Sequence, residues 1–156
     1  KTTNAGVNWS QLSSGITNNI NSITFVGNNF GVAAADSGKI VKTTNGGLNW
    51  IRDSTYNPDY YQIGVLFGVK AVNENLAYVS GSGGRIIKAS NGGNNWITTT
   101  GGSVNLQSNY FINELTGYAV GYEGTILKTT DGGNVWNNQI SNTTKNLQDV
   151  DHNEYG

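Results

Sequence analysis

The sequence contains no cysteine and no methionine, and its single histidine is His152. Without cysteine the chain can form neither disulfide bonds nor metal sites built on thiolate ligands. A lone histidine with no second histidine or cysteine nearby is a poor basis for a zinc site. No cofactor is expected either, because the glycine pairs do not open helices as a phosphate-binding loop would.

Charge is also scarce and nearly balanced. Nine lysines and arginines stand against ten acidic residues, and charged residues make up 12% of the chain. Such a chain lacks the basic surface that binds nucleic acid or an anionic membrane. No apolar run approaches the roughly 20 residues of a membrane-spanning helix, so membrane insertion is not expected. A cysteine-free, charge-poor chain rich in Asn, Gly and Thr favours a bacterial protein exported to the periplasm or the extracellular space.

Proline occurs once, at Pro58, whereas glycine occurs 22 times. This composition supplies turns without the stiffness of proline, which is typical of many short strands. Apolar residues alternate over segments of about five residues, and no stretch shows a helical period with caps. The sequence therefore predicts an all-β fold of antiparallel strands.

One sequence motif, called the repeated phrase below, recurs four times along the chain. It ends at Trp9, Trp50, Trp96 and Trp136, which are 41, 46 and 40 residues apart, within the range of propeller blades. A sheet of three or four strands cannot bury both of its faces alone, so such units must stack around a shared core. Stacked all-strand units of this length form a β-propeller, and the chain holds about three and a half blades.

The core of the repeated phrase is Thr-x-Asn/Asp-x-Gly-x-x-Trp. We expect the Asn or Asp side chain to accept backbone N–H groups, the glycine to supply a positive φ, and the tryptophan to fold beneath the turn. A metal- or sugar-binding role is the alternative, but scaffold repeats whereas a site is normally unique. The structural hairpin residues are therefore Asn4, Gly6 and Trp9; Asn45, Gly47 and Trp50; Asn91, Gly93 and Trp96; and Asp131, Gly133 and Trp136.

This motif closely resembles the Asp-box, or BNR repeat, which recurs at one hairpin of each blade in a class of β-propellers. The wider phrase LTGYAVGYEGTILKTTDGGNVW resembles the photosystem II assembly and stability factor type of propeller, whose blades carry a G-x-A-V-G-x-x-G-x-I-x-x-T-x-D-G-G-x-x-W pattern. Residues 117–136 match that pattern almost throughout, residues 31–50 depart from it at Ala35, and residues 77–96 at Ala77. The resemblance implies the propeller architecture, and such blades also occur in many secreted bacterial proteins.

The repeat divides the chain into units. They are residues 1–9 (the end of a blade), 10–50, 51–96 and 97–136 (three blades), and 137–156 (the start of a further blade). Joined together, the two ends would lack the counterpart of residues 118–127 and would expose unpaired strand edges. We therefore expect a segment of a larger propeller. Three and a half units are half of a seven-bladed ring, so self-association of two copies through their incomplete terminal blades is a further hypothesis.

Residues 51–68 differ most from the other repeats, because this unit is five or six residues longer than its neighbours. Loops on a rigid scaffold carry specificity, and exposed tyrosines stack on sugars or anchor protein partners. The loop is thus a candidate for binding a protein or glycan partner, with covering of the blade edge as the alternative. The candidate binding residues are Tyr56, Asp59, Tyr60 and Tyr61 in the loop, and Lys39 and Arg85, which could grip an anion from a repeated turn.

Together these features favour a non-enzymatic binding or assembly scaffold, and two alternatives stay open. One is part of an Asp-box glycoside hydrolase of sialidase or endoglucanase type, for which Asp36 and Glu123 are a candidate carboxylate pair. Sialidases that resemble this repeat bind the substrate carboxylate with three arginines, whereas this chain has only Arg52 and Arg85. The other alternative is a structural subunit of a surface layer or filament.

Overall fold

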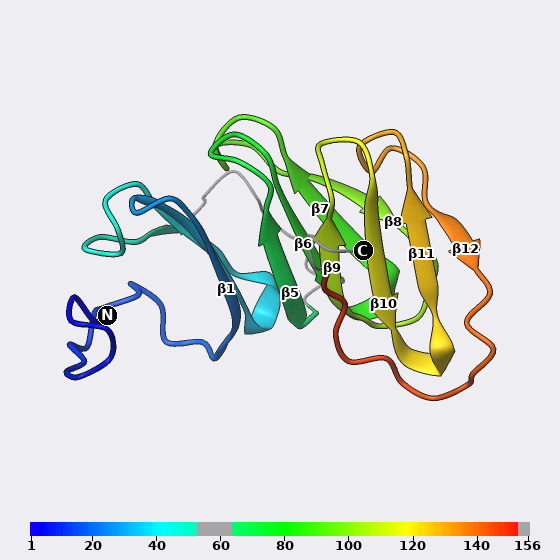
Figure 1. The fold of residues 1–156 in the computed structure, drawn as a ribbon, viewed down its shortest axis with the longest axis horizontal. Helices are drawn as coiled ribbons and strands as arrows, with labels where there is room; N and C mark the ends of the chain where they lie inside the picture. Colours follow the sequence, from blue (N-terminus) through cyan, green and yellow to red (C-terminus); the bar gives the residue numbers. More distant parts are fainter. Residues whose placement is uncertain (53–63, 153–156) are drawn as a thin grey trace.

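The structure is a computed structural model that describes residues 1–52 and 64–152 (Figure 1). Its strands form three four-stranded antiparallel sheets, which confirms the expected all-β fold. The first sheet contains β1 (Ile20–Val26), β2 (Phe30–Ala35), β3 (Ile40–Thr43) and β4 (Ile51–Arg52); the second contains β5 (Leu66–Ala71), β6 (Ala77–Gly81), β7 (Arg85–Ala89) and β8 (Ile97–Thr100); the third contains β9 (Leu106–Phe111), β10 (Gly117–Gly121), β11 (Ile126–Thr129) and β12 (Asn137–Gln139). None of the described residues forms a helix long and apolar enough to span a membrane.

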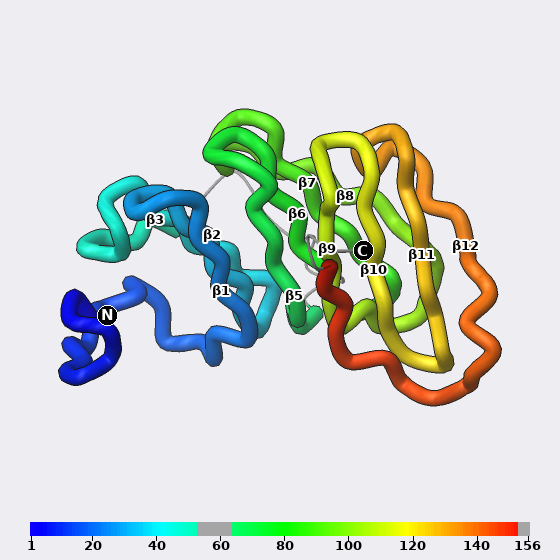
Figure 2. Tube along the Cα trace, in the orientation of Figure 1, coloured from blue at the N-terminus to red at the C-terminus, as the bar shows by residue number. Residues whose placement is uncertain are grey.

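Each sheet is a meander, because its four strands pair in their order along the chain. The sheets stand side by side, with β5 packed between the other two first strands, β1 and β9 (Figure 1). After β12 the chain turns back, and residues 147–152 run beside β9 (Figure 2). The Leu147 N–H donates to the Gly121 carbonyl (2.9 Å) at the start of this segment. Residues 147–152 therefore extend the row of first strands.

The fourth strand of every sheet begins directly after the tryptophan of the repeated phrase. β4 follows Trp50, β8 follows Trp96 and β12 follows Trp136. Each sheet therefore includes a short strand from beyond the tryptophan, and the hairpin that carries the phrase joins its third and fourth strands.

The hydrophobic core lies between neighbouring sheets rather than inside one of them. The first interface buries Val32, Ala34 and Ile40 against Leu66, Val69 and Ile87. At the second interface the rings of Tyr78 and Phe111 stack with centroids 3.7 Å apart. Burial of each large apolar side chain contributes about 1.5–3 kcal/mol, so a single sheet would leave most of its stabilising surface in water.

A second contact repeats between neighbouring hairpins that carry the tryptophans. In each case a lysine ammonium donates to a turn carbonyl of the next hairpin along the chain. The pairs are Lys1 with Gly46 (2.9 Å), Lys42 with Gly92 (2.8 Å) and Lys88 with Gly132 (2.7 Å). Hydrogen bonds from a charged donor are the stronger kind, so this contact ties each hairpin to its neighbour.

A tight turn joins the second and third strands of each sheet. These turns are η1 (Asp36–Gly38), η3 (Ser82–Gly84) and η4 (Tyr122–Gly124). The final glycine has a φ of 66°, 69° and 71° in the three turns. An L-residue with a Cβ atom is strained by roughly 1–2 kcal/mol in this region, which explains the glycine.

We expect Gly84→Ala to cost about 3 kcal/mol of folding free energy, and Gly83→Ala only about 1 kcal/mol. Both glycines have a positive φ, but a Cβ at Gly84 would lie 2.3 Å from the Gly102 carbonyl oxygen, whereas one at Gly83 meets nothing within 4 Å. Ser37 and Glu123 hold the position equivalent to Gly83 with a φ of 57°. Chemical denaturation of both variants measures the difference, and equal costs would contradict this account of the turn.

Candidate functional site

The hairpin around Asn45 illustrates how the repeated phrase closes a turn. The Thr43 hydroxyl donates to Asn45 Oδ1 (2.9 Å) and accepts from the Gly47 N–H (3.0 Å). Asn45 Oδ1 also accepts from the Asn49 N–H (2.9 Å). Two side chains thus bind the amide groups that the reversal leaves without a strand partner, as Asx and Ser/Thr turns do.

The other hairpins repeat this arrangement with one variation. The N-terminal hairpin has the same bonds at Thr2 and Asn4, and the last one has them at Thr129 and Asp131. In the third copy Ala89 replaces the threonine, and Asn91 Oδ1 alone accepts from the N–H groups of Asn94 (3.1 Å) and Asn95 (3.0 Å). The hairpin therefore forms without the hydroxyl, which supports the turn but does not define it.

Each tryptophan ring lies beneath the second residue after the Asn or Asp of its own hairpin, a glycine in all four copies. A Cβ built on Gly93 would lie 3.3 Å from the Trp96 ring, and the other three glycines stand in the same relation to their tryptophans. The degree of burial differs, because Trp96 is 6% exposed whereas Trp9 is 73% exposed. Trp50 and Trp136 are half-buried, so the four hairpins shield their indoles from water to different degrees.

The carboxylate of Asp131 is the charged member of the hairpin series. The backbone N–H of Val135, the Thr129 hydroxyl and the backbone N–H of Asn134 donate to it, and these bonds lower the pKa of Asp131 below its ordinary value. All its donors come from the hairpin itself, so the carboxylate serves as an acceptor inside the turn. Among the described residues no group of three or more His, Asp and Glu side chains could hold a metal ion.

A polar groove of about 410 Å³ runs along the first strands of the three sheets. β1, β5 and β9 each have a bulge near their start, so side chains at matching positions of the three strands point to the same side. One set of side chains therefore turns into the sheet interfaces and the other lines this surface. The inner groove, as we call it, is lined by Ser22, Thr24, Lys70, Ser108, Tyr110, Asp149 and Asp151, among others.

The inner groove has internal contacts that fix its charged and aromatic groups. The Lys70 ammonium lies 4.2 Å from the centroid of the Tyr110 ring, a cation–π distance. The His152 ring lies 6.2 Å from the same centroid, with 22° between the ring planes. The Ser108 hydroxyl donates to Asp149 (2.6 Å). The groove thus presents the Lys70 ammonium, the Tyr110 ring and the exposed carboxylates of Asp149 and Asp151 on a floor of strands.

Sequence reasoning did not identify this groove. The alternation of polar residues at Ser22 and Thr24, and at Ser108 and Tyr110, was a usable signal for a polar face. Asp149 and His152 lie in the residues that the repeat assigns to the start of a further blade, but their contacts with Ser108 and Tyr110 could not be read from the spacing of the repeat.

The structure does not bring Lys39 and Arg85 into one anion site. Lys39 lines a hollow of about 400 Å³ with Arg52 and residues 13–18, and Arg85 is not part of its lining. Arg85 is 9% exposed, and its Nη1 atom has no hydrogen-bond partner in the part of the chain that the structure describes. The loop candidates Tyr56, Asp59, Tyr60 and Tyr61 lie outside the described residues.

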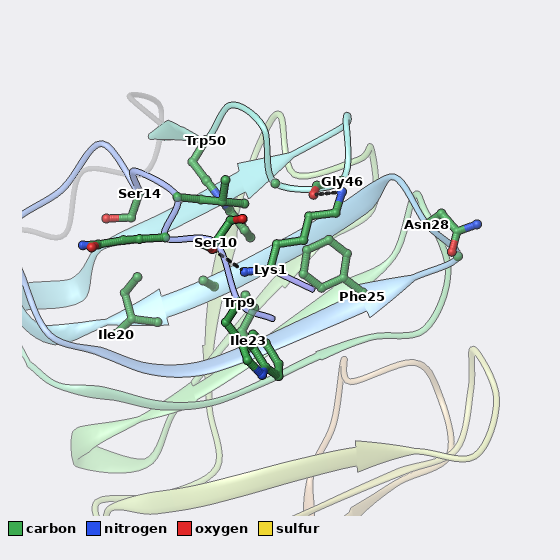
Figure 3. A pocket seen from close by; sticks show the side chains of 15 residues that line it. Lys1, Trp9, Ser10, Ser14, Ile20, Ile23, Phe25, Asn28, Gly46 and Trp50 are labelled. Carbon is green, nitrogen blue, oxygen red and sulfur yellow. Dashed lines mark hydrogen bonds between the residues drawn. The ribbon is translucent and has the colours of Figure 1, made fainter. Parts of the chain in front are cut away.

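A second hollow, of about 520 Å³, lies between the N-terminal segment and the outer face of the first sheet (Figure 3). The side chains of Trp9, Ile23 and Phe25 line it, and Lys1 crosses it to reach Gly46. Ile23 is 55% exposed, whereas its counterpart in the second sheet, Val69, is buried against the first. This face of the first sheet therefore has the apolar character of a sheet–sheet interface.

Solved structures with the same arrangement of sheets are β-propellers. YCF48 from Cyanidioschyzon merolae matches with a TM-score of 0.75 and 19% identity over 86% of this chain. The fold is that of β-propeller blades. YCF48 bound to D1 peptide matches with a TM-score of 0.71 and 18% identity over 85% of the chain, and an ancestral GH74 enzyme with 0.67 and 18% over 90%. No protein-family model and no curated protein matches the chain.

The chain spans less than half of each matched propeller. It covers 44% of both YCF48 chains and 21% of the ancestral GH74 enzyme. The three sheets described here therefore correspond to a subset of the blades in those proteins, and the likeness concerns the fold.

We expect Trp96→Ala to cost about 3–5 kcal/mol of folding free energy, because it removes a buried aromatic ring. Trp9→Ala should cost much less, because the Trp9 ring is largely exposed. Urea denaturation of the two variants gives both values. Equal losses, or unchanged stability in the Trp96 variant, would disprove the role of the indole as buried support for its hairpin.

Acid should weaken the last hairpin through Asp131. Because the folded chain lowers the pKa of this carboxyl, its stabilisation is complete above the ordinary value of 3.8 and is lost as the pH falls through the folded pKa. We expect Asp131→Asn to remove this dependence, since Asn45 closes the same turn without a charge. Melting temperatures between neutral pH and pH ~3 test this, with Glu123→Gln as the control, and parallel curves for wild type and Asp131→Asn would contradict it.

Proposed function

We propose that this chain is part of a β-propeller that acts as a non-catalytic scaffold and binds a protein partner along the inner groove. The observation that carries the proposal is the convergence of Lys70, Tyr110 and Asp149 from three chain segments on one polar surface. The hairpin residues are engaged in structural hydrogen bonds, so the unique residues of the groove are better candidates for recognition.

The chemistry of the groove favours a peptide segment over a sugar. Sugars are recognised largely by stacking on an open aromatic face, but the Lys70 ammonium already lies over the Tyr110 ring. A peptide instead offers backbone donors and acceptors together with charged side chains, which match the hydroxyl, ammonium and carboxylate groups here. The structure of YCF48 bound to D1 peptide supports the proposal, since a protein with this fold takes a peptide ligand.

Two finer assignments belong to the same proposal. The four tryptophan hairpins are Asp-boxes, and the chain is related to the photosystem II assembly factor type of propeller; the shared hydrogen-bond pattern and the likeness to YCF48 support this. The protein is exported from a bacterial cell, which the absence of cysteine and the low charge support. Finding the native protein only in the cytosolic fraction of its source cells would contradict export.

Selection from a random peptide phage library tests the binding proposal. We expect peptides enriched on the chain to lose at least about tenfold in affinity on Lys70→Met and on Tyr110→Ala, because both change the groove surface. Fluorescence anisotropy with the best labelled peptide measures this loss, and Lys145→Met, a change at an exposed lysine outside the groove, is the control. No enrichment over an unrelated protein, or equal binding to all variants, would refute the proposal.

A glycoside hydrolase is the second candidate function, because Asp149 and Asp151 line the same hollow and an ancestral GH74 enzyme shares the fold. Alternate residues of an extended chain point to the same side, so the two carboxylates face one ligand. Asp36 accepts an amide of Asn19 or Asn21 at each of its two oxygens (both 2.9 Å), whereas the Ser108 hydroxyl and the Val150 N–H both bind the same oxygen of Asp149. Hydrolysis of a soluble β-glucan that Asp149→Asn and Asp151→Asn both abolish would establish this function in place of the scaffold.

A further inference from the structure

The dipeptide Asn-Gly occurs twice in the chain, and both copies lie in the tryptophan hairpins. They are Asn45–Gly46 and Asn91–Gly92. Asparagine is a chemically labile residue, and it loses its side-chain ammonia most readily before glycine, which leaves the following backbone nitrogen uncrowded. That nitrogen attacks Cγ, the carboxamide carbon of the asparagine. Local chemistry therefore makes these two asparagines the most reactive of the sequence.

The turn around Asn91 binds the carboxamide oxygen of this residue. Asn91 Oδ1 accepts from the backbone N–H groups of Asn94 (3.1 Å) and Asn95 (3.0 Å). Negative charge develops on this oxygen when a nucleophile attacks Cγ, and two fixed N–H donors stabilise such charge as an oxyanion hole does. The hairpin thus already activates the carbon that is attacked.

The folded hairpins hold back the attacking nitrogen instead. The Gly92 N–H donates to the Asn75 carbonyl (3.0 Å), and the Gly46 N–H donates to the Asn29 carbonyl (2.9 Å). A nitrogen bound in this way keeps its proton, so the reaction requires a local opening of the hairpin that releases it. The ease of this opening then decides which of the two asparagines reacts.

The two hairpins differ in one side chain that holds the turn closed. The Thr43 hydroxyl accepts from the N–H groups of Asn45 (3.3 Å) and Gly47 (3.0 Å) and donates to Asn45 Oδ1 (2.9 Å). Ala89 holds the equivalent position before Asn91 and can make none of these bonds. The glycine after Asn45 is also buried, whereas the glycine after Asn91 is half-buried. The hairpin at Asn91 therefore opens more easily and admits water more readily.

We propose that Asn91 is a modification site of the folded chain: it deamidates spontaneously, whereas Thr43 protects Asn45 in the same dipeptide. The Asn91 hairpin joins β7 to β8 in the second sheet, which lies between the first and the third (Figure 1). Asn91 is exposed and does not line the inner groove, so the proposal is independent of peptide binding.

The reaction needs only water as a co-reactant. A bond forms between the Gly92 backbone nitrogen and Asn91 Cγ, and the bond from Cγ to Nδ2 breaks. Nδ2 leaves as ammonia and takes the proton of the backbone nitrogen with it. Water then opens the cyclic imide. Opening at Cγ gives aspartate, whereas opening at the backbone carbonyl carbon gives isoaspartate, in which the main chain runs through the side chain.

The last hairpin shows that the aspartate product fits this turn. Asp131 holds the position of Asn91 there, and its Oδ1 accepts from two backbone N–H groups, both at 3.0 Å. Deamidation to aspartate therefore keeps the turn and adds a negative charge to the hairpin whose Gly92 carbonyl binds the Lys42 ammonium (2.8 Å). Isoaspartate lengthens the main chain by a carbon atom, so the same turn cannot close.

Peptide mapping by mass spectrometry tests the proposal on the whole chain. The folded chain is incubated in mildly alkaline buffer, and the deamidated fraction at each asparagine is followed with time. We expect Asn91 to react about fivefold faster than Asn45, the factor that one hydrogen bond supplies. In the urea-unfolded chain the two should react at equal rates, because both precede Gly-Gly.

Substitutions at the threonine position assign the difference to the hydroxyl. Ala89→Thr should slow the reaction at Asn91 about fivefold, since the other three hairpins carry threonine at this position. Ala89→Val adds the same shape without the hydroxyl, so it is the matched control and should leave the rate unchanged. Thr43→Val should raise the rate at Asn45 to that at Asn91. Circular dichroism verifies that all three variants fold.

Three results would overturn the proposal. One is equal deamidation of Asn91 and Asn45 in the folded chain. Another is an equal effect of Ala89→Thr and Ala89→Val on the rate at Asn91. The third is an Asn91 that stays unmodified in the folded chain after the unfolded chain has reacted completely. Asn91→Asp, which represents the product, should keep the circular dichroism spectrum of the unmodified chain, and a misfolded variant would contradict the tolerance of the turn for aspartate.

Discussion

A lysine ammonium bound to the turn carbonyl of the next hairpin is the contact on which the arrangement of the sheets depends. It joins neighbouring sheets twice, from Lys42 and Lys88, and ties the N-terminal hairpin to the first sheet from Lys1, with lengths between 2.7 and 2.9 Å. The apolar cores between sheets supply most of the stabilising free energy, but apolar burial has no direction. The lysine contacts tie each tryptophan hairpin to the next. Between the first strands, the Asn21 amide donates to the Leu66 carbonyl (2.9 Å) and the Val69 N–H donates to the Ser22 hydroxyl (3.2 Å).

The hairpins are the repeated part of the molecule, whereas the exposed side chains of the first strands differ from sheet to sheet. The hairpins use their polar groups on their own turns, as the carboxylate of Asp131 does. The first strands are held side by side and can differ from sheet to sheet without loss of the fold. Their exposed side chains, such as Lys70 and Tyr110, differ in charge and shape. Recognition is therefore expected on the inner groove, and mechanical support at the hairpins.

Much of the fold could be predicted from the sequence, because each hairpin depends on local chemistry. Thr43, Asn45 and Gly47 close a turn with bonds that span at most four residues, and the spacing of the tryptophans predicts the number of sheets. The contacts between sheets were not predictable in the same way. A lysine occupies the same repeat position at Lys42 and Lys88, but the acceptor of Lys42 lies 50 residues away on another hairpin. The inner groove forms only because residues 147–152 run beside β9. Trp96 is buried and Trp9 is exposed because their surroundings in neighbouring parts of the fold differ.

Side-chain NMR of the lysine ammonium groups tests this account most directly. In a ¹⁵N,¹³C-labelled chain, a hydrogen bond from Nζ to a carbonyl gives a measurable scalar coupling across the bond and slows proton exchange. We predict such couplings from Lys42 Nζ to the Gly92 carbonyl carbon and from Lys88 Nζ to that of Gly132, with slower exchange than at the exposed Lys145. Ammonium groups that all exchange alike and show no coupling would contradict the account.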